Sequence, residues 1–379
     1  MVISPLGAIL MDSLKITPSH FGLVVSVYAF SAGASGLITA GFADKFDRKK
    51  LILFFYFGFM FGTVLCAIAE NFHFLVIART ITGLFGGVIS SIGLAIVTDL
   101  FPMEVRGRVM GFVQMAFAAS QVFGIPIGLV LANKWGWHAP FWMIAGGGMF
   151  IGVIMLIFMR PITDHLHAQT RQSAIRHLGK TISRPPYLLS FLTTTLMSTG
   201  MFMLAPFGSA FSIHNLGLTF EQLPTLYGIT GVFSAIIGPI VGRISDTFGK
   251  FRIFWIGSIA GSFMVAIYTH LGLTPLWLVI VVSVLLYTTI SSRVISGMAL
   301  LTAVPDRGDI GAFMSVVSSV RQIAGGVSSV IAGLIVGQAA SGLILNYGIL
   351  GYVVIGSMLL AIVLMYFIDQ FVNSKQKAN

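Results

Sequence analysis

Charged residues are scarce in this chain, and their scarcity excludes a soluble globular protein. Only 9% of the 379 residues are charged, whereas 56% are hydrophobic, and the mean hydropathy is +0.95. A water-soluble globule of this length cannot bury so much apolar surface, because polar side chains must cover its outside. The composition therefore predicts an integral membrane protein.

Residues that build catalytic, metal and cofactor sites are also scarce. The single cysteine, Cys66, lies in an apolar stretch, so neither a disulfide framework nor a cysteine-based metal site is available. The chain has no HExxH zinc-protease motif and no GxxxxGK[ST] phosphate-binding loop. Its net charge of +10 is spread between apolar stretches instead of over a soluble face, which argues against nucleic acid as a partner. We therefore expect no enzyme, no metal and no cofactor.

Twelve apolar stretches run along the chain and predict an all-α membrane fold. All but the first can cross about 30 Å of hydrocarbon, which takes about 20 helical residues at 1.5 Å each. They cover residues 1–14, 21–40, 51–69, 74–98, 109–132, 140–159, 187–211, 223–244, 251–271, 275–303, 310–337 and 343–371. The first is short and would place a charged amino group inside the bilayer, so we expect its helix to be truncated at the N-terminus. A short interfacial segment is the alternative.

Two similar loops divide the chain into halves. AGFADKFDRKK at residues 40–50 and GRISDTFGKFR at residues 242–252 each join two apolar stretches, with Asp44 and Asp246 at the same position. Parallel repeats in membrane transporters form two bundles around a shared cleft. The sequence therefore predicts two pseudo-symmetric bundles of six helices each.

The distribution of basic residues predicts the orientation and the domain boundaries. Most of the 22 Lys and Arg residues lie in loops on the side of the two similar loops, which places these loops and the C-terminus in the cytoplasm. Residues 1–159 form the first predicted bundle and residues 187–379 the second. The polar segment 160–186 between them reads as an amphipathic linker on the anionic inner leaflet. A regulatory docking helix is the alternative for this segment.

Several motifs in the first half resemble those of the major facilitator superfamily. AGFADKFDRKK resembles the family's loop signature after the second helix, and ARTITG at residues 78–83 resembles the arginine signature of the fourth. SQVFGIPIG at residues 120–128 is a partial form of the antiporter signature of the fifth. Ala40 departs from the glycine that usually opens the loop signature, and Leu129 replaces a glycine of the fuller antiporter signature.

The resemblance covers essentially the whole chain, and it implies the function of a transporter. It is closest to drug:proton antiporters of the bacterial arabinose-efflux-like group. It implies a monomer in the bacterial inner membrane that exports a small molecule, drug-like compound, sugar or metabolite, by alternating access in exchange for protons. A facilitator or an organic-anion exchanger that uses intramembrane arginines stays open, and a sensor with a transporter fold is a more remote alternative.

The same resemblance implies a conformational latch in the loops. Asp44, Arg48 and Asp99 match the family's latch positions, which hold the outward-facing state by contacts between neighbouring helices. Asp246 is the counterpart of Asp44 in the second half, where fewer basic residues surround it. The alternative is that the basic residues near Arg48 only fix the topology.

Three arginines, Arg79, Arg293 and Arg321, fall inside apolar stretches. A permanent charge there must find carbonyl groups, an acid, water or a ligand. No Asp or Glu occupies the middle of any stretch. The excess of arginines predicts either an anionic substrate at Arg293 or Arg321, or an acid in the part of the first helix that precedes Met1, where resembling proteins often carry one. Pairing with backbone carbonyls is a further possibility for Arg321.

Other uncharged residues are candidates for the substrate cavity. Gln121 and Gln322 occupy corresponding positions of the two halves, and a buried amide in a membrane faces a cavity or another helix. Tyr28, Met201 and Tyr287 carry aromatic or thioether groups that suit varied apolar ligands. Ordinary packing is the alternative for each of them.

Gly124, Pro126 and Gly128 form a candidate helix-bending motif in the fifth stretch. Proline frees a carbonyl group and kinks a helix, and the flanking glycines permit bending and close contact. The resemblance implies that this segment seals the central cavity. A purely structural kink is the alternative.

Overall fold

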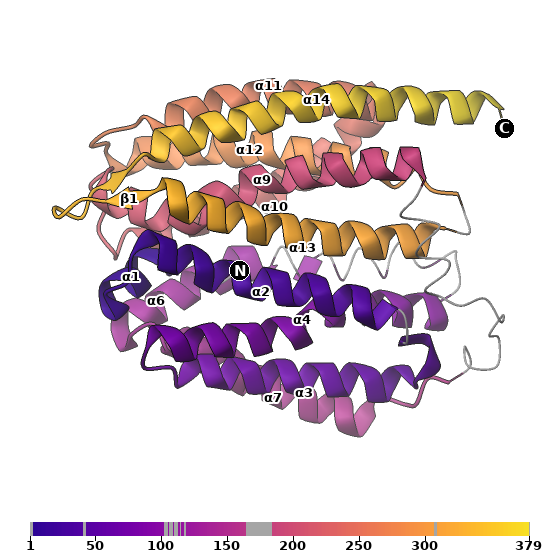
Figure 1. Cartoon of the computed structure of the whole chain (residues 1–379), viewed down its shortest axis with the longest axis horizontal. Helices are drawn as coiled ribbons and strands as arrows, with labels where there is room; N and C mark the ends of the chain where they lie inside the picture. The colour runs from indigo at the N-terminus through magenta and orange to yellow at the C-terminus, as the bar shows by residue number, and fades with distance from the viewer. Residues whose placement is uncertain are drawn as a thin grey trace.

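Helices form almost all of the computed structural model (Figure 1), which describes residues 3–40, 43–101, 119–163, 184–306 and 309–378 and a few single positions between 105 and 116. The first half contains α1 (Gly7–Leu14), α2 (Pro18–Ala40), the 3-10 turn η1 (Ala43–Lys45), α3 (Arg48–Ala67), α4 (Phe72–Leu100), the π-helical turn η2 (Ser120–Gly124), α6 (Ile125–Trp135) and α7 (Ala139–Phe158). The second half contains α9 (Pro185–His214), α10 (Leu223–Phe248), α11 (Lys250–Thr269), α12 (Leu276–Leu301), α13 (Ile310–Ile335), the strands β1 (Gly337–Gln338) and β2 (Ile344–Leu345), and α14 (Tyr347–Ala378). The two strands pair antiparallel as a hairpin.

The helices follow the predicted membrane-spanning stretches. Within the described residues, nine helices are long and apolar enough to cross a membrane: α2, α3, α4, α7, α9, α10, α11, α12 and α14. Three predicted stretches are occupied by α1, by η2 with α6, and by α13, a helix of 26 residues that contains Arg321 and Gln322. Lipid cannot satisfy backbone polar groups, so apolar stretches of this length fold as helices. The prediction of an all-α, twelve-helix membrane fold is confirmed.

Polar side chains and glycines set several helix ends. The side chain of Asp47 accepts a hydrogen bond from the amide of Lys49 (2.9 Å) and caps α3. Asn71 caps α4 in the same way by accepting from the amide of Phe74 (2.9 Å). These caps satisfy amide groups that have no partner within the helix. Between α10 and α11 the chain turns at Gly249, whose φ of 99° is a conformation that glycine adopts without strain.

The two halves lie side by side and meet along α2 and α13, which are neighbours in the middle of Figure 1. Glycines allow the two helices to approach closely. A Cβ atom at Gly22 would lie 2.7 Å from the carbonyl oxygen of Ser329, and one at Gly33 would lie 3.1 Å from that of Ser319. Small residues permit such backbone contact between helices in lipid. The close contact of α2 and α13 therefore depends on glycine at positions 22 and 33, because a larger side chain there would push the two helices apart.

The bundle has two ends along its long axis, which we name for the segments found there. The β1 end, at the left of Figure 1, holds the β1–β2 hairpin and the turns at residues 15–17 and 270–275. The C-terminal end, at the right, holds η1, residues 302–306 and the end of α14. The predicted orientation places the C-terminal end in the cytoplasm.

Part of the predicted domain division falls outside the described residues. The helices of the first half end with α7 at Phe158, and those of the second half begin with α9 at Pro185. The predicted linker at 160–186 lies between them, but residues 164–183 of it are outside the described ranges. Its amphipathic character remains a prediction.

Candidate functional site

A partly buried ion pair joins two helices of the first half at the C-terminal end. Arg48 begins α3, and its Nε donates to Oδ2 of Asp99 in the last turns of α4 at 2.9 Å. The exposed fractions of the two side chains are 6% and 21%. Arg48 also donates from Nη1 to the carbonyl oxygen of Ala43 in η1 (3.2 Å). One guanidinium thus holds η1, α3 and α4 together.

The segment after α7 is attached to the same corner. The amide of Arg48 donates to the carbonyl oxygen of Ile162 (3.2 Å), and the amide of Ile162 donates to Oδ1 of Asp47 (2.9 Å). The backbone of Asp44 lies in η1, whereas its side chain is outside what the structure describes. Of the predicted latch residues, the structure therefore brings Arg48 and Asp99 together.

The repeated loop of the second half lacks this arrangement. Asp246 is 74% exposed in α10, and its Oδ1 lies 3.9 Å from Nζ of Lys250, the first residue of α11. Exposed pairs of this kind contribute little to stability because water and salt screen them. The structure does not bring Asp246 into a buried pair like that of Arg48.

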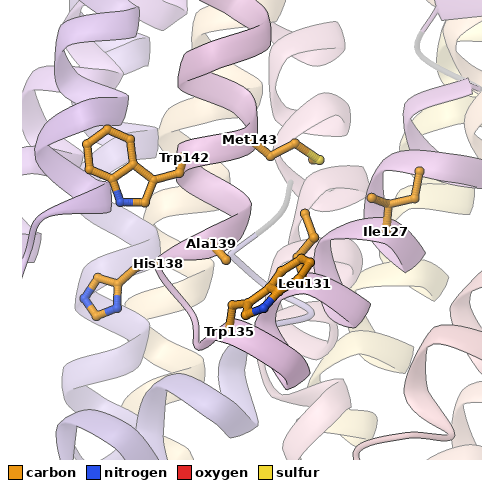
Figure 2. Close-up of a pocket in the computed structure, with 7 residues that line it drawn as sticks. All are labelled: Ile127, Leu131, Trp135, His138, Ala139, Trp142 and Met143. Carbon is orange, nitrogen blue, oxygen red and sulfur yellow. The ribbon is translucent and has the colours of Figure 1, made fainter.

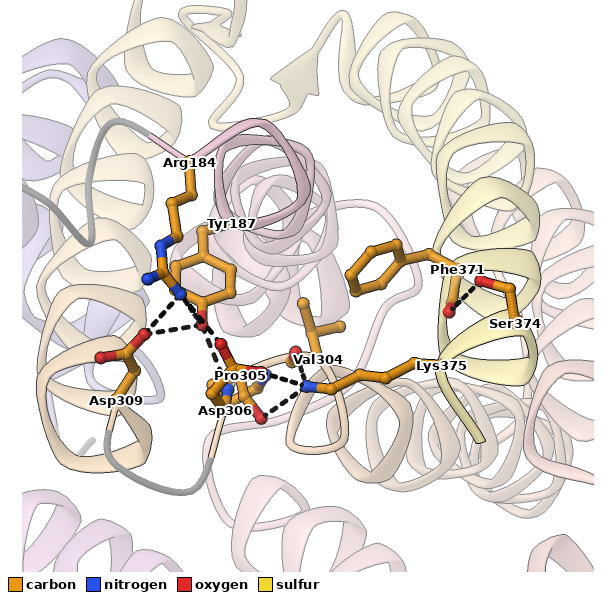
Figure 3. A network of polar contacts seen from close by, with 9 residues as sticks. All are labelled: Arg184, Tyr187, Val304, Pro305, Asp306, Asp309, Phe371, Ser374 and Lys375. Atoms are coloured by element: carbon orange, nitrogen blue, oxygen red, sulfur yellow. Dashed lines mark hydrogen bonds and ion pairs between the residues drawn. The ribbon is translucent and has the colours of Figure 1, made fainter. Parts of the chain in front are cut away.

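A second network, of ion pairs and hydrogen bonds, joins the helices of the second half at the C-terminal end (Figure 3). Nη1 of Arg184 lies 2.8 Å from Oδ2 of Asp309 and 3.0 Å from Oδ2 of Asp306. Nζ of Lys375, near the end of α14, lies 2.7 Å from Oδ1 of Asp306. Tyr187 donates its hydroxyl to Asp309 (3.0 Å) and accepts from the amide of Asp306 (3.1 Å). The turn between α12 and α13 is thereby held by α9 and by α14.

This network shifts the ionisation of its members. The hydrogen bond from Lys375, followed by the positive charges of Lys375 and Arg184, lowers the pKa of Asp306 below its usual 3.8. The hydrogen bond to Tyr187 and the charge of Asp309 raise the pKa of Arg184. Both shifts favour the charged forms, so the network is intact at neutral pH.

Arg79 is buried in the first half against a predicted cavity residue. It lies on α4 with an exposed fraction of 8%, and its Nε lies 3.4 Å from the carbonyl oxygen of Val24. Its guanidinium carbon stands 4.4 Å from the ring centroid of Tyr28. A carbonyl oxygen and an aromatic face are suitable partners for a buried guanidinium. Arg79 and Tyr28 therefore form one unit between α2 and α4.

The other two intramembrane arginines differ from each other in burial. Arg293 of α12 is 2% exposed, and its Nε and Nη2 have no hydrogen-bond partner among the described residues. Its guanidinium carbon lies 5.8 Å from the ring centroid of Phe254. Arg321 of α13 is exposed, next to a half-buried Gln322. The two arginines lie on different helices, and of the two only Arg293 has buried donor nitrogens that lack a partner within the described residues.

The candidate helix-bending motif coincides with a change of helix type. η2 is a π-helical turn that ends at Gly124, and α6 continues with Pro126 and the buried Gly128. Proline has no amide hydrogen to donate, and π-turns are a recognised cause of helix kinks. The sequence indicated a break here, although not its π-helical form.

Glycines of α10 pack against this turn from the other half. A Cβ atom at Gly231 would lie 3.0 Å from the carbonyl oxygen of Gln121, and one at Gly228 would lie 3.5 Å from the ring of Pro126. Gln121 thus contributes its backbone to the boundary between the halves, and Gln322 lies on another helix at that boundary. That these two amides face one cavity remains a prediction.

Among the described residues, three hydrogen bonds cross between the halves towards the β1 end. Oγ of Ser19 donates to the carbonyl oxygen of Gly333 (2.8 Å), and Nδ2 of Asn133 donates to that of Phe220 (2.8 Å). The amide of Ala8 in α1 donates to Oγ of Ser209 in α9 (3.3 Å). These contacts join α2 to α13, α6 to the segment before α10, and α1 to α9. The two halves are therefore in contact at the β1 end.

The remaining predicted cavity residues are partly exposed. Met201 of α9 is 44% exposed and Tyr287 of α12 is 38% exposed, while Tyr28 is half-buried. A place for them in one substrate cavity remains a prediction.

Two pockets lie at the β1 end and are lined by other residues. One, of about 580 Å³, follows the turn from α6 to α7, where Trp135 and His138 lie with other apolar side chains (Figure 2). His138 is held there by a contact of 2.8 Å between its Nε2 and the carbonyl oxygen of Ala69. The other, of about 620 Å³, lies where Asp12 and Lys15 of the first half meet β1 of the second. This second pocket marks the junction of the halves.

Sequence reasoning missed the residues that join distant segments. Tyr187, Asp309 and Lys375 are far apart in the sequence, and no motif signals their contact. Ser19 and Gly231 also join distant segments, but the sequence contains many other small residues that do not stand out from them. The only available signal for Arg184 and Asp306 was charge next to a predicted helix end.

Comparisons with known proteins agree with this architecture. The family model of the Major Facilitator Superfamily matches residues 1–329. An uncharacterised MFS-type transporter of Bacillus subtilis, YceJ, is 26% identical over 66% of this chain, and the match spans 64% of that relative's own length. Multidrug resistance protein 2 of the same organism is 23% identical over 71% of this chain and 68% of its own.

A solved structure has a similar fold over nearly the whole chain. The crystal structure of a bacterial homologue of the human lysosomal transporter Spinster, in an inward-facing and unoccupied conformation, superposes with a TM-score of 0.74 at 14% identity, covering 98% of this chain and 92% of that one. The family model matches most of the chain's length and the fold has twelve helices in two packed halves, so this chain belongs to the Major Facilitator Superfamily.

Proposed function

We propose that this transporter exports a small molecule across the bacterial inner membrane by alternating access, in exchange for protons. The observation that carries the proposal is the boundary between the halves. Hydrogen bonds from Ser19 and Asn133 close it at the β1 end, the periplasmic side in the predicted orientation. Export then requires these contacts to break while the opposite end closes.

The proposal of export draws on the sequence motifs and on the relatives. The partial antiporter signature contains η2 and Pro126, which pack against α10 where the halves meet. A relative that covers 71% of the chain bears the name of a multidrug resistance protein. Partly exposed aromatic and thioether side chains, such as Tyr287 and Met201, suit drug-like compounds as well as other small molecules.

The latch belongs to the same proposal. We assign Arg48 and Asp99, with Asp44 beside them, to a corner that moves as one piece when the halves rock. Their hydrogen bonds tie η1, α3 and α4 rigidly at the C-terminal end. Asp246 contributes less, because its carboxylate is exposed.

An organic-anion exchanger is the second candidate, and Arg293 favours it. Proton exchange needs a group that titrates near neutral pH, and arginine does not. Within the described residues, the carboxylate of Asp12 belongs to the last turns of α1 beside the pocket at the β1 end. Arg293, by contrast, lies deep in the second half with two unsatisfied donors.

Counterflow in proteoliposomes distinguishes the two candidates. A panel of radiolabelled amphipathic compounds, sugars and organic acids is tested with and without an imposed pH gradient. Proton-linked export predicts accumulation that a protonophore abolishes. Accumulation that depends only on an organic anion on the opposite side would instead establish the exchanger, and ligand binding with no flux of any compound would reject transport in favour of a sensor.

A further inference from the structure

Arg293 is enclosed by four helices of the second half. It projects from α12, with Phe254 of α11 against its guanidinium. A Cβ atom at Gly200 of α9 would lie 3.8 Å from Nη1 of Arg293 and 3.3 Å from Val354 of α14. Gly257 of α11 brings the two backbones together, since its Cβ atom would lie 3.2 Å from the amide nitrogen of Arg293. The side chain is therefore inside the bundle and does not face lipid.

The two unsatisfied nitrogens of Arg293 are on one edge of its guanidinium. The N–H bond of Nε and one N–H bond of Nη2 lie in the guanidinium plane and point in parallel from the same edge, where a carboxylate accepts both at once. Both are buried and lack a partner among the described residues. A buried donor without an acceptor costs free energy, and more so when it is charged. The two donors on this edge match the two oxygens of a carboxylate.

The protein supplies no described carboxylate for this edge. On α14, Val354 marks the level of Arg293, and Asp369 follows 15 residues later, about 22 Å along a helix. The other described carboxylates of the second half lie near helix ends or in connections: Glu221, Asp246, Asp306 and Asp309. An arginine stays charged in a protein, and Nε and Nη2 of Arg293 have no acceptor among the described residues, so a bound anion would supply the counter-ion that these residues do not.

A second buried donor lies in the same layer. Ser258 of α11 is fully buried, and its Oγ also has no partner among the described residues. It follows Gly257, which packs on the backbone of Arg293, and it is one turn from Phe254 on the same face of α11. Neighbouring hydroxyls differ, because Ser262 and Ser296 donate to carbonyl oxygens of their own helices.

We propose that Arg293 and Ser258 bind the carboxylate of a transported organic acid. This site deepens the proposed function, on which its role in transport rests. Nε and Nη2 of Arg293 hold the two carboxylate oxygens, and Oγ of Ser258 donates to one of them. The ring of Phe254 provides an apolar surface for the rest of the molecule. Because the donors are closed to solvent in this conformation, the acid binds when the helices around them separate.

Thermal unfolding of the purified full chain in detergent, with defined probes, tests the site. Benzoate, acetate and decanoate provide carboxylates of different size, benzamide is the uncharged analogue of benzoate, and chloride is a carboxyl-free anion. We expect at least one carboxylate to raise the unfolding midpoint with increasing concentration, with no effect of benzamide and a weaker one of chloride. The assay needs no gradient, so a failure of export would not affect it.

Substitutions then locate the effect. Arg293→Met removes the charged edge and is expected to weaken carboxylate binding about tenfold to a hundredfold, and Ser258→Ala about threefold to tenfold. Arg293→Lys keeps the charge without the paired donors and should bind at an intermediate level. Arg252→Met and Ser262→Ala are matched controls, since Arg252 is exposed and Ser262 already has an acceptor. Both should bind like the unchanged protein.

Three results would overturn the proposal. The first is that no carboxylate raises the midpoint of the unchanged protein. In the second, the effect of the carboxylate persists in Arg293→Met. The third is that chloride matches the carboxylates in the unchanged protein, which would make the site one for an inorganic anion. If Arg293→Met does not fold, Arg293→Lys and the comparison of benzoate with benzamide still test whether Arg293 binds a carboxylate.

Discussion

Arg48 connects η1, α4 and the segment after α7 at the C-terminal end, through its side chain and its backbone amide. Its guanidinium contacts Asp99 of α4 and the carbonyl of Ala43, and its amide contacts Ile162 after α7. Because most of each side chain is buried, replacing one partner costs the other a charge-assisted hydrogen bond that water does not readily replace. We therefore expect this pair to contribute more to the free energy of unfolding than an exposed pair does.

Replacing Asp99 by Asn tests that contribution. Loss of the charge-assisted hydrogen bond should destabilise the protein by about 1.5–3 kcal/mol. Asp246→Asn is the control, because its exposed carboxylate should contribute less than about 0.5 kcal/mol. Unfolding can be followed by thiol labelling of Cys66, which is fully buried when folded. Equal effects of the two substitutions would contradict this account of Arg48.

The ion pairs of Asp306 with Arg184 and Lys375 predict that the stability of the protein depends on pH. Its pKa is depressed in the folded state, so its contribution is full above the unfolded value of 3.8 and is lost as the pH falls through the lower folded value. We expect the unchanged protein to be more stable than Asp306→Asn above about pH 5, and this difference to vanish in stronger acid. A difference that stays constant down to pH 2 would show that Asp306 does not contribute through its charge.

At the residue scale, the sequence motifs named two residues that the structure brings into contact. The resemblance located Arg48 and Asp99 because both occur within recognisable signatures. It did not locate the partners of Arg184 or the donor Ser258, since these contacts depend on which helices become neighbours. Arg293 was identified as a charge in an apolar stretch, but the unsatisfied edge of its guanidinium could only come from the structure.

At the scale of elements, the contact between η2 and α10 depends on the glycine at position 231, which has no side chain. Gly231 lets the backbone of α10 approach Gln121, and the carbonyl there would lie 3.0 Å from an added Cβ atom. The motif SQVFGIPIG predicted an irregular helix, and η2 with Pro126 is such an irregularity. Gly231, which packs against η2, lies 110 residues after Gln121 in the sequence and carries no motif of its own.

Gly231→Val is expected to push α10 away from η2 and to weaken the closure of the β1 end. Overpacking at such a contact typically costs about 1–3 kcal/mol, and here the cost applies to the closed state. The measurement is the reactivity of Asn133→Cys, in a Cys66→Ser background, towards a membrane-impermeant thiol reagent. We expect reactivity to rise, because Asn133 contacts Phe220 across the boundary.

A matched control lies on the same helix. A Cβ atom at Gly242 would meet nothing within 4 Å, so Gly242→Val should leave the reactivity of the introduced cysteine unchanged. Equal effects of the two valine substitutions would mean that helix propensity, and not the contact with η2, controls the β1 end.

At the scale of the whole molecule, the two halves form one transporter by meeting along α2 and α13. The sequence repeat predicted two bundles, and the length of the apolar stretches predicted their helices, because both are encoded locally. The closure of the β1 end was not predictable from the sequence, since the free energies of alternative conformations differ by only a few kcal/mol. The hydrogen bonds of Ser19 and Asn133 define that end in this structure.

The central claim is that the two ends of the boundary open in alternation. Double electron–electron resonance in lipid nanodiscs measures it with two pairs of spin labels at exposed sites. One pair, at Lys134 and Glu221, spans the halves at the β1 end, and the other, at Lys50 and Arg252, spans them at the C-terminal end. Both pairs are measured in the otherwise unchanged protein and with Gly231→Val. We predict that the substitution lengthens the first distance and shortens the second, whereas distances that lengthen together or do not change would contradict alternating access.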